Sequence, residues 1–202
     1  MAFPLYTSHR GIALSSDPFS PAINSLRQLK TKFVIVGGIA VAQYLPGRFT
    51  EDLDILISVE DADSMRNELR QIGATAIRSL SIGGHTFRLS SGLELDVLES
   101  SAAWTQCALD HPTTVSAGWP VIGVPFLVLM KLDAGRERDL RDIALIVGSF
   151  ADEQFTVIRN TVLQFLPDAV DDLISLRELG ALELGSQSDQ TEVRSAPRQE
   201  DP

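Results

Sequence analysis

Residues 33–55 read FVIVGGIAVAQYLPGRFTEDLDI and decide most of the fold. The stretch begins with the continuous apolar run Phe33–Val36, and the glycine pair Gly37-Gly38 follows directly. A run of this kind, rich in β-branched residues, predicts a buried strand. Ile39 to Leu45 then predicts a short helix that ends at the following proline, and Leu53 to Val59 predicts a second strand. The stretch therefore predicts a strand, a glycine turn, a helix and another strand.

Periodicity and the intervening glycines and prolines predict the other elements, before and after this stretch. An irregular arm is expected over residues 1–20, followed by a helix through Ile23, Leu26 and Leu29. Three short strands are expected at Ala74–Leu80, Thr86–Ser90 and Leu93–Leu98. The expected later helices are Asp61–Ile72, Phe126–Ala134, Arg138–Val147, Glu153–Leu166 and Asp168–Leu182.

This order of elements predicts an α/β (α+β) fold, in which a small mixed β-sheet is flanked by helices and followed by a helical C-terminal part. The core domain is expected over residues 21–123 and the helical part over 124–184. Residues 185–202 contain one aliphatic residue larger than alanine, Val193, and are expected to be disordered.

The composition limits the kinds of partner. The chain has 202 residues, 17 Lys and Arg, 27 Asp and Glu, and a formal net charge of -10. Strong non-specific nucleic-acid binding usually needs a basic surface, so DNA is not an expected partner, although a local basic cleft is compatible with the count. The single cysteine, Cys107, excludes an internal disulfide. No apolar run reaches the roughly 20 residues of a membrane span, no signal-peptide pattern is present, and the cytoplasm is the expected location.

Two carboxylates stand at the start of the second predicted strand. Asp52 and Asp54 are two residues apart, and because side chains alternate along a strand, both project from the same face. Two adjacent anions repel each other unless a cation or a proton lies between them. Hard oxygen ligands suit Mg²⁺ or Mn²⁺, so the pair predicts a metal site.

A third carboxylate is expected from the strand Leu93–Leu98. Its sequence alternates, with Glu94 and Asp96 on one face and apolar residues on the other. If this strand pairs beside the second strand, Asp96 can lie next to the first two acids and complete a two-metal arrangement for attack on an α-phosphorus. Asp96 is preferred on length and strand register, and Glu94 remains the competing candidate.

The glycine pair predicts a phosphate site beside these acids. Gly37 and Gly38 end a strand and open a helix, where glycines permit close backbone approach and free N–H groups attract anions. Arg48 and Thr50, in the loop before the acids, are candidates for phosphate binding or for simple capping of the strand. Together these features predict a place for a metal-chelated nucleoside triphosphate.

These residues resemble the signature of the DNA polymerase β-like nucleotidyltransferase superfamily. The similarity lies in the order and spacing of the motifs. Gly-Gly is followed by thirteen residues (39–51), by Asp-Leu-Asp-Ile and by a later Asp on a strand. The motif Arg48-x-Thr50-x-Asp52-Leu53-Asp54 most resembles the sequences of the minimal branch that contains AbiEii-type abortive-infection toxins and related type IV toxin–antitoxin proteins. Residues 131–142, KLDAGRERDLRD, are similar to a downstream Lys-x-x-Ala-x-Arg…Lys-Asp-x-x-Asp region of that branch.

The resemblance implies roles for particular residues. The glycine turn, Gly37 and Gly38, contacts the triphosphate, and the three acids named above bind metal. Lys131 and Asp139 help to organise the nucleotide and the acceptor. The residues alone leave other interpretations open: Lys131 also fits a lysine reaching solvent at a helix edge, and Asp139 and Asp142 also fit a solvated face that pairs with nearby arginines.

The implied reaction is metal-dependent transfer of a nucleoside monophosphate from an NTP, ATP included, to a hydroxyl acceptor with release of pyrophosphate. The acceptor implied by the toxin branch is a tRNA 3′ end; a protein side chain or a small molecule is also compatible. A cognate antitoxin is an implied partner. Two other functions remain open: a non-catalytic, antitoxin-like member that binds a nucleotide or a partner, and an antibiotic-modifying nucleotidyltransferase.

Overall fold

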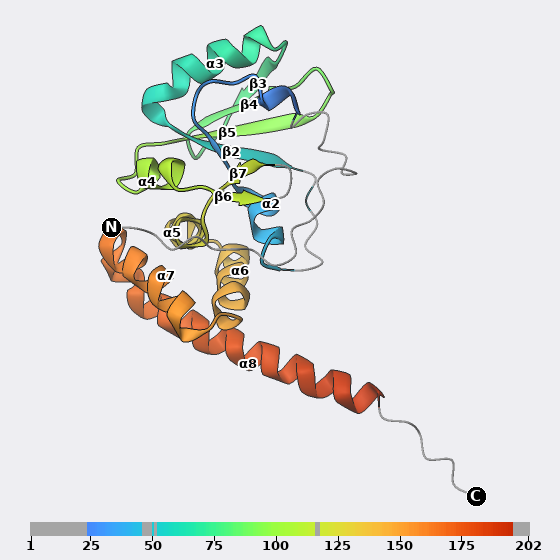
Figure 1. Cartoon of the computed structure of the whole chain (residues 1–202), viewed down its shortest axis with the longest axis vertical. Helices are drawn as coiled ribbons and strands as arrows, with labels where there is room; N and C mark the ends of the chain where they lie inside the picture. Colours follow the sequence, from blue (N-terminus) through green and yellow to red (C-terminus); the bar gives the residue numbers. More distant parts are fainter. Residues whose placement is uncertain (1–23, 46–49, 51, 116–117, 196–202) are drawn as a thin grey trace, which may run out of the picture. The chain divides into compact units, whose positions relative to one another are not determined.

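The computed structural model describes residues 24–45, 50, 52–115 and 118–195 (Figure 1). The chain divides into two compact units, Met1–Leu127 and Val128–Pro202. The predicted N-terminal arm over residues 1–20 lies outside the described residues. None of the helices in the described ranges is long and apolar enough to cross a membrane.

The first unit is built on a seven-stranded mixed sheet with the order β3-β4-β5-β2-β1-β7-β6 (Figure 1). Two neighbouring pairs, β2 with β5 and β1 with β7, are parallel, and the other four pairs are antiparallel. The strands are β1 (Val34–Ile35), β2 (Leu53–Ser58), β3 (Thr75–Ser79), β4 (Gly84–Arg88), β5 (Glu94–Ser100), β6 (Thr113–Val115) and β7 (Trp119–Val121). The predicted α/β class and the mixed sheet are confirmed.

The short pair β6 and β7 was not predicted from the sequence. Each strand has three residues, and β7 contains Pro120, which pairs with Thr114. A proline inside a short run argues against a strand, because it removes a backbone donor. The pair is nevertheless built into the sheet, because Val121 lies opposite Ile35 of β1 and the Ile122 N–H donates to the Ile35 carbonyl at 2.9 Å.

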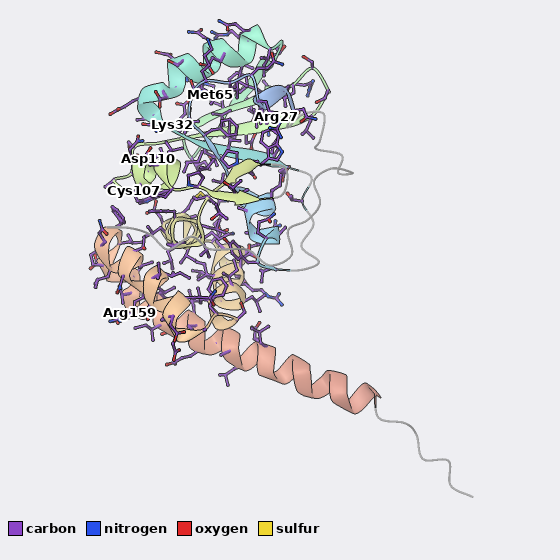
Figure 2. The ribbon with its side chains drawn as sticks, in the orientation of Figure 1. Arg27, Lys32, Met65, Cys107, Asp110 and Arg159 are labelled. Carbon is purple, nitrogen blue, oxygen red and sulfur yellow. The ribbon has the colours of Figure 1, made fainter. Side chains whose placement is uncertain are left out.

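The helices of the first unit follow the predicted order. They are α2 (Gly37–Ala42), the 3-10 turn η2 (Val59–Asp61), α3 (Ala62–Gln71) and α4 (Thr105–Asp110), and residues 24–26 form one helical turn. Arg27, which follows that turn, stacks on Trp119 of β7 with its guanidinium carbon 4.3 Å from the ring centroid (Figure 2 labels Arg27). This cation–π contact fixes the start of the described chain against the sheet.

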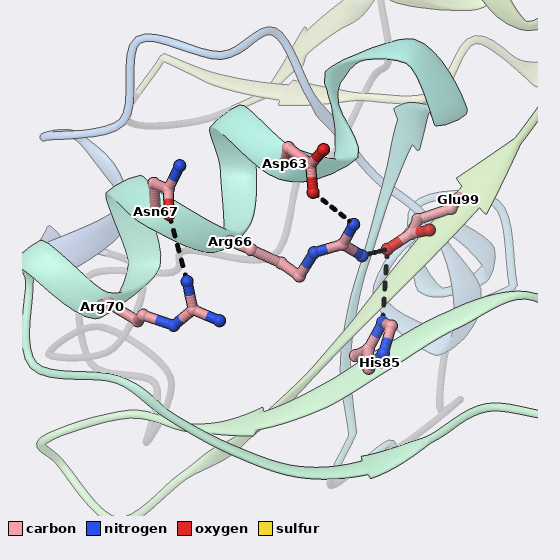
Figure 3. Close-up of polar contacts among 6 residues, drawn as sticks. All are labelled: Asp63, Arg66, Asn67, Arg70, His85 and Glu99. Carbon is pink, nitrogen blue, oxygen red and sulfur yellow. Dashed lines mark hydrogen bonds and ion pairs between the residues drawn. The ribbon is translucent and has the colours of Figure 1, made fainter.

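Helix α3 is attached to the sheet by apolar and ionic contacts. Met65 is fully buried, as the predicted periodicity requires. Arg66 contacts two carboxylates, Asp63 and Glu99, each at 2.8 Å, and the Glu99 oxygen also lies 3.3 Å from His85 Nδ1 (Figure 3). The ion pair with Glu99 is largely shielded from solvent, so it joins α3 to β5 more firmly than a surface pair would.

The two central strands β2 and β5 separate a core face from a polar face. Leu53, Ile55 and Ile57 of β2 are buried, and Leu95 and Val97 of β5 are buried beside them. Side chains alternate along a strand, so the acids between these residues lie on the opposite face. The burial of one face thus fixes the register and, with it, the position of the acids.

The second unit is helical, as predicted. Its helices are α6 (Glu137–Gly148), α7 (Asp152–Phe165) and α8 (Val170–Ser195), with the 3-10 turn η3 (Pro167–Ala169) before α8; α5 (Val124–Ala134) begins within the first unit. The expected disorder from residue 185 is wrong for residues 185–195, which belong to α8. Extending an existing helix costs little compared with starting one, and the first proline after Val170 is Pro197. Residues 196–202 lie outside the described ranges.

Helices α6 and α8 cross at a contact made of small residues. A Cβ placed on Gly180 would overlap the backbone carbonyl of Ala144, and one placed on Gly148 would lie 2.5 Å from the Gly180 backbone. Backbone cannot turn aside as a flexible side chain can, so the close packing of these helices depends on both glycines.

Gly180→Ala is therefore expected to lower the free energy of unfolding by about 1–3 kcal/mol, because the added methyl group overpacks this crossing. Gly185→Ala, in the same helix, has open space around its Cβ and serves as the matched control. It is expected to raise stability by up to about 1 kcal/mol through helix propensity. Urea denaturation followed by far-UV circular dichroism measures both, and equal stabilisation by the two variants would contradict the close crossing.

Candidate active site

The parallel pairing of β2 with β5 places two of the predicted acids side by side. Asp54 lies opposite Asp96 in the register of the two strands. On the far side of β5, Thr86 of β4 lies opposite Asp96, and its hydroxyl donates to Asp96 Oδ1 at 2.6 Å. Paired residues of neighbouring strands face the same side of a sheet, so these three side chains form one row. The position expected for Asp96 is confirmed.

Asp52 stands directly before β2, two residues from Asp54. It is exposed, and its backbone N–H donates to the hydroxyl of Thr50 at 3.2 Å. Thr50 thus accepts a backbone hydrogen bond directly before β2, which fits the capping role considered for it. Arg48 lies outside the described residues.

The surroundings of Asp54 raise the pKa of its carboxyl group. Burial first, and then the negative charges of Asp96 and Asp52, together raise its pKa from 3.8 to about 6, although a hydrogen bond from the Gly38 backbone N–H opposes them. Asp54 is therefore close enough to both other acids to be repelled by them. A buried carboxyl group in this setting favours a proton or a cation beside it.

The glycine turn packs directly against this acid. Gly37 has a φ of +62°, and a Cβ on it would overlap Asp54 Oδ2. A Cβ on Gly38 would lie 2.5 Å from the Thr50 side chain. The backbone of the glycine pair closely approaches the side chains of Asp54 and Thr50, and its approach to a phosphate stays a prediction. The Gly38 N–H, expected to be free for an anion, contacts Asp54 instead.

Gly37→Ala is expected to reduce nucleotidyl transfer by at least about tenfold, because its Cβ displaces the Asp54 carboxylate and small displacements of catalytic groups are costly. The matched control is Gly92→Ala, which has the same kind of left-handed backbone, φ +89°, but open space around its Cβ. Both variants should lose about 1–2 kcal/mol of stability from backbone strain. Equal activity of the two variants in an initial-rate assay would show that the contact between Gly37 and the Asp54 carboxylate does not affect catalysis.

The structure also separates the two candidates for the third acid. Glu94 is engaged by two arginines, with Arg88 at 2.9 Å and Arg78 at 3.0 Å. Those hydrogen bonds, from Arg88 first and Arg78 second, hold the pKa of Glu94 below its usual range. Asp96 lies directly opposite Asp54, whereas the Glu94 carboxylate is directed to β3 and β4. The geometry favours Asp96.

The acids do not form a preassembled metal site. Within the described ranges, no group of three or more His, Cys, Asp or Glu side chains is placed so that it could hold a metal ion. The donor set nevertheless fits a hard divalent cation, since Asp54 and Asp96 are adjacent carboxylates, and the pKa of Asp54 is raised by burial first and by its acidic neighbours second. Asp52 is exposed.

Lys131, Asp139 and Asp142 come together in the second unit. The ammonium group of Lys131 lies 2.5 Å from Asp139 Oδ1 and 2.9 Å from Asp142 Oδ2, and Lys131 and Asp142 are both buried. The alternative interpretations of a lysine reaching solvent and of a solvated face for Asp142 are therefore wrong. The sequence did not show that the partners of Lys131 are eight and eleven residues downstream.

The family comparison matches almost the whole chain. The family model described as "Nucleotidyl transferase AbiEii toxin, Type IV TA system" matches residues 22–201. The chain therefore belongs to the AbiEii nucleotidyltransferase family, and it is a nucleotidyltransferase. The comparison with curated proteins gives no match.

Several solved structures are similar to this chain at low identity. A nucleotidyltransferase-like antigenic protein from Paracoccidioides brasiliensis is 19% identical, with a TM-score of 0.47, over 79% of this chain and 93% of that one. The antibiotic-resistance factor ANT(2'')-Ia is 13% identical, with a TM-score of 0.46, over 90% and 99%. A putative nucleotidyltransferase from Thermotoga maritima is 18% identical, with a TM-score of 0.45, over 66% and 92%.

Thr86 is a site residue that sequence analysis did not identify. It is fully buried and bonded to Asp96, yet it was considered only as the first residue of a strand. Alternation along β4 places it on the acid face, but only the β4–β5 register shows that it stands opposite Asp96. The type of turn between β4 and β5 fixes their register, so knowledge of that turn type would have placed Thr86 opposite Asp96.

Proposed function

We propose that this protein transfers a nucleoside monophosphate from an NTP to a hydroxyl acceptor and releases pyrophosphate, in a reaction that requires Mg²⁺ or Mn²⁺. The observation that carries the proposal is the pairing of Asp54 with Asp96 across β2 and β5, beside the glycine turn. The assigned ligands are Asp52, Asp54 and Asp96. A divalent cation held by them supplies Lewis-acid stabilisation of the triphosphate charge and makes the acceptor hydroxyl more acidic.

The residues of the chain have separate tasks in this reaction. Gly37 leaves room for the Asp54 carboxylate, and Thr86 holds Asp96 by its hydroxyl hydrogen bond. The acceptor oxygen attacks the α-phosphorus, and a new O–P bond forms as the bond to the bridging oxygen breaks. Pyrophosphate leaves with that electron pair, and the hydroxyl proton passes to Asp96. The Gly37-Gly38 turn, with Thr50 and Arg48, is assigned to the triphosphate side.

Roles for the second unit and for partners follow from the family. Lys131 is assigned to nucleotide binding, with Asp139 as its positioning partner through their ion pair. The acceptor is assigned as a tRNA 3′ end, the cognate antitoxin as a protein partner, and the cytoplasm as the location. The toxin–antitoxin description of the family supports the assignment of an antitoxin partner.

The test incubates the full chain with Mg²⁺, total tRNA and each of four α-³²P-labelled NTPs. We expect label in tRNA with at least one NTP, equimolar release of pyrophosphate, and loss of both on addition of EDTA. Reactions that contain protein alone, or a cell lysate in place of tRNA, identify other acceptors. Absence of transfer to every acceptor, together with absence of Mg²⁺-dependent NTP binding, would contradict the proposed reaction and favour a binding module.

A further inference from the structure

Two arginines lie on the acid face of the sheet, beyond Asp96. Arg78 of β3 pairs with Thr86 of β4 in the strand register, and Arg88 of β4 pairs with Glu94 of β5. Both guanidinium groups contact Glu94, and Arg78 Nη2 also lies 4.0 Å from Asp96 Oδ1. Both arginines are more than half exposed. This pair, Arg78 and Arg88, is called the edge arginines below.

The sheet order gives the edge arginines a direction relative to the acids. The glycine turn follows β1 and abuts Asp54 on one side, and β5, β4 and β3 follow β2 on the other. In an in-line displacement the attacking and leaving oxygens lie on opposite sides of the phosphorus. With the triphosphate on the glycine side, the acceptor approaches from the side of β5 and β4, and the edge arginines lie on β4 and β3.

A pocket adjoins the same edge of the sheet. Its volume is about 510 Å³, and its lining includes Arg88 with Thr75, Ile77 and Ser90. This volume lies within the range of about 300–1,000 Å³ that is usual for small-molecule sites. There is accordingly room for a nucleotide-sized group next to Arg88.

We propose that the edge arginines bind the phosphates of an RNA acceptor near its 3′ end, and that Glu94 occupies them when the acceptor is absent. This proposal rests on the proposed function, which it extends by assigning the acceptor side of the site. Guanidinium groups match phosphate geometry with two parallel hydrogen bonds. The pairs with Glu94 are solvent-exposed ion pairs, which contribute little stability, so a phosphate displaces Glu94 at small cost.

The local charge explains how a chain of net charge -10 can bind RNA here. Removal of Glu94 leaves both edge arginines without their common carboxylate, and Arg88 lines the pocket. Removal of either arginine leaves Glu94 with one arginine partner. Glu94 and the edge arginines should therefore have opposite effects on RNA affinity. A purely structural role in the β3–β4–β5 sheet predicts instead that loss of either partner has the same effect, a small loss of stability.

The experiment measures the Kd of the full chain for 5′-labelled total tRNA by fluorescence anisotropy, with Mg²⁺ and without NTP. Arg78→Gln and Arg88→Gln are each expected to raise the Kd about tenfold, as loss of a charged hydrogen bond does. Each should also reduce the slope of log K against log salt by about 1. Glu94→Gln is expected to lower the Kd severalfold. The matched control is Arg70→Gln, an exposed arginine of α3 bonded to Asn67, which should leave the Kd unchanged.

Binding of labelled NTP with Mg²⁺, measured by equilibrium dialysis on the same variants, separates the two proposals. We expect it to be unchanged in Arg88→Gln, Glu94→Gln and Arg70→Gln; Arg78→Gln is left out of this comparison because Arg78 lies 4.0 Å from Asp96, an assigned metal ligand. The inference is overturned if wild-type protein fails to bind tRNA, if the edge-arginine variants bind it like wild type, or if Glu94→Gln weakens binding. If the variants change the Kd for tRNA as expected but no nucleotide is transferred, the proposed reaction is overturned and the RNA-binding role of the edge arginines stands.

Discussion

Asp54→Asn is expected to reduce nucleotidyl transfer about a thousandfold or more, since loss of a metal ligand removes several kcal/mol of transition-state stabilisation. In metal-free buffer the same change is expected to stabilise the fold at pH 8. The Asp54 carboxyl group is partly buried near two other acids, and its pKa is raised to about 6. An amide of the same shape removes the repelling charge without creating a cavity.

The pH dependence follows from the direction of this shift. Between pH 3.8 and about 6 the folded protein retains a proton on Asp54 that the unfolded chain has lost, so stability falls as pH rises through this window. One pKa unit corresponds to about 1.4 kcal/mol, which makes the full loss about 3 kcal/mol above pH 6. Because the buried amide also loses hydration, Asp54→Asn should recover about 1–3 kcal/mol at pH 8 and nothing at pH 3.5.

Urea denaturation at both pH values, with EDTA, measures this effect. Asp63→Asn is the control, because Asp63 is exposed and its hydrogen bond with Arg66 lowers its pKa, so no stabilisation is expected. Addition of Mg²⁺ should stabilise the wild type at pH 8 and leave Asp54→Asn unchanged. A wild-type transfer rate in Asp54→Asn, or destabilisation by this variant at pH 8, would contradict the role assigned to Asp54.

Lys131→Met has the largest expected effect on stability. The ammonium group of Lys131 is buried between Asp139 and Asp142, and its removal leaves two carboxylates without their common cation. Breaking a buried ion pair from one side costs about 3–5 kcal/mol, because a charge remains buried without compensation. The second unit should therefore unfold at much lower urea concentration.

Lys32→Met provides the comparison. Lys32 also lies 2.8 Å from a carboxylate, that of Asp110, but both side chains are exposed (Figure 2), and the expected loss is below about 1 kcal/mol. Both tryptophans, Trp104 and Trp119, lie in the first unit, so circular dichroism at 222 nm is needed to follow the second unit. Equal stabilities of Lys131→Met and Lys32→Met would contradict a buried, ion-paired Lys131.

The central part of the fold was predictable because local signals agree there. The apolar run before Gly37-Gly38 gave β1 and the turn, and alternation in Leu53–Ser58 and Glu94–Ser100 gave β2 and β5 with their acids on one face. The adjacency of Asp54 and Asp96 depends on strand pairing, which is a non-local property, and the expected pairing of the two strands is present.

Other features depend on contacts that no local pattern reports. Thr86 and the edge arginines acquire their relation to the acids from the β3–β4–β5 register, which includes an irregularity between Ala76 and Arg78. The strand around Pro120 exists because a neighbouring strand supplies its pairing. In α8 the polar composition indicated disorder, whereas the helix continues to Ser195 because nothing in the sequence interrupts it.

The convergence of Asp52, Asp54 and Asp96 on divalent cations is tested most directly by a crystal structure with Mn²⁺ and a non-hydrolysable NTP. Mn²⁺ scatters anomalously, so its position is seen independently of the surrounding atoms. We expect an anomalous peak between Asp54 and Asp96, with carboxylate oxygens of both at about 2.0–2.3 Å and with Asp52 turned toward it. An NTP bound with its manganese elsewhere, and no peak at these carboxylates, would contradict the account.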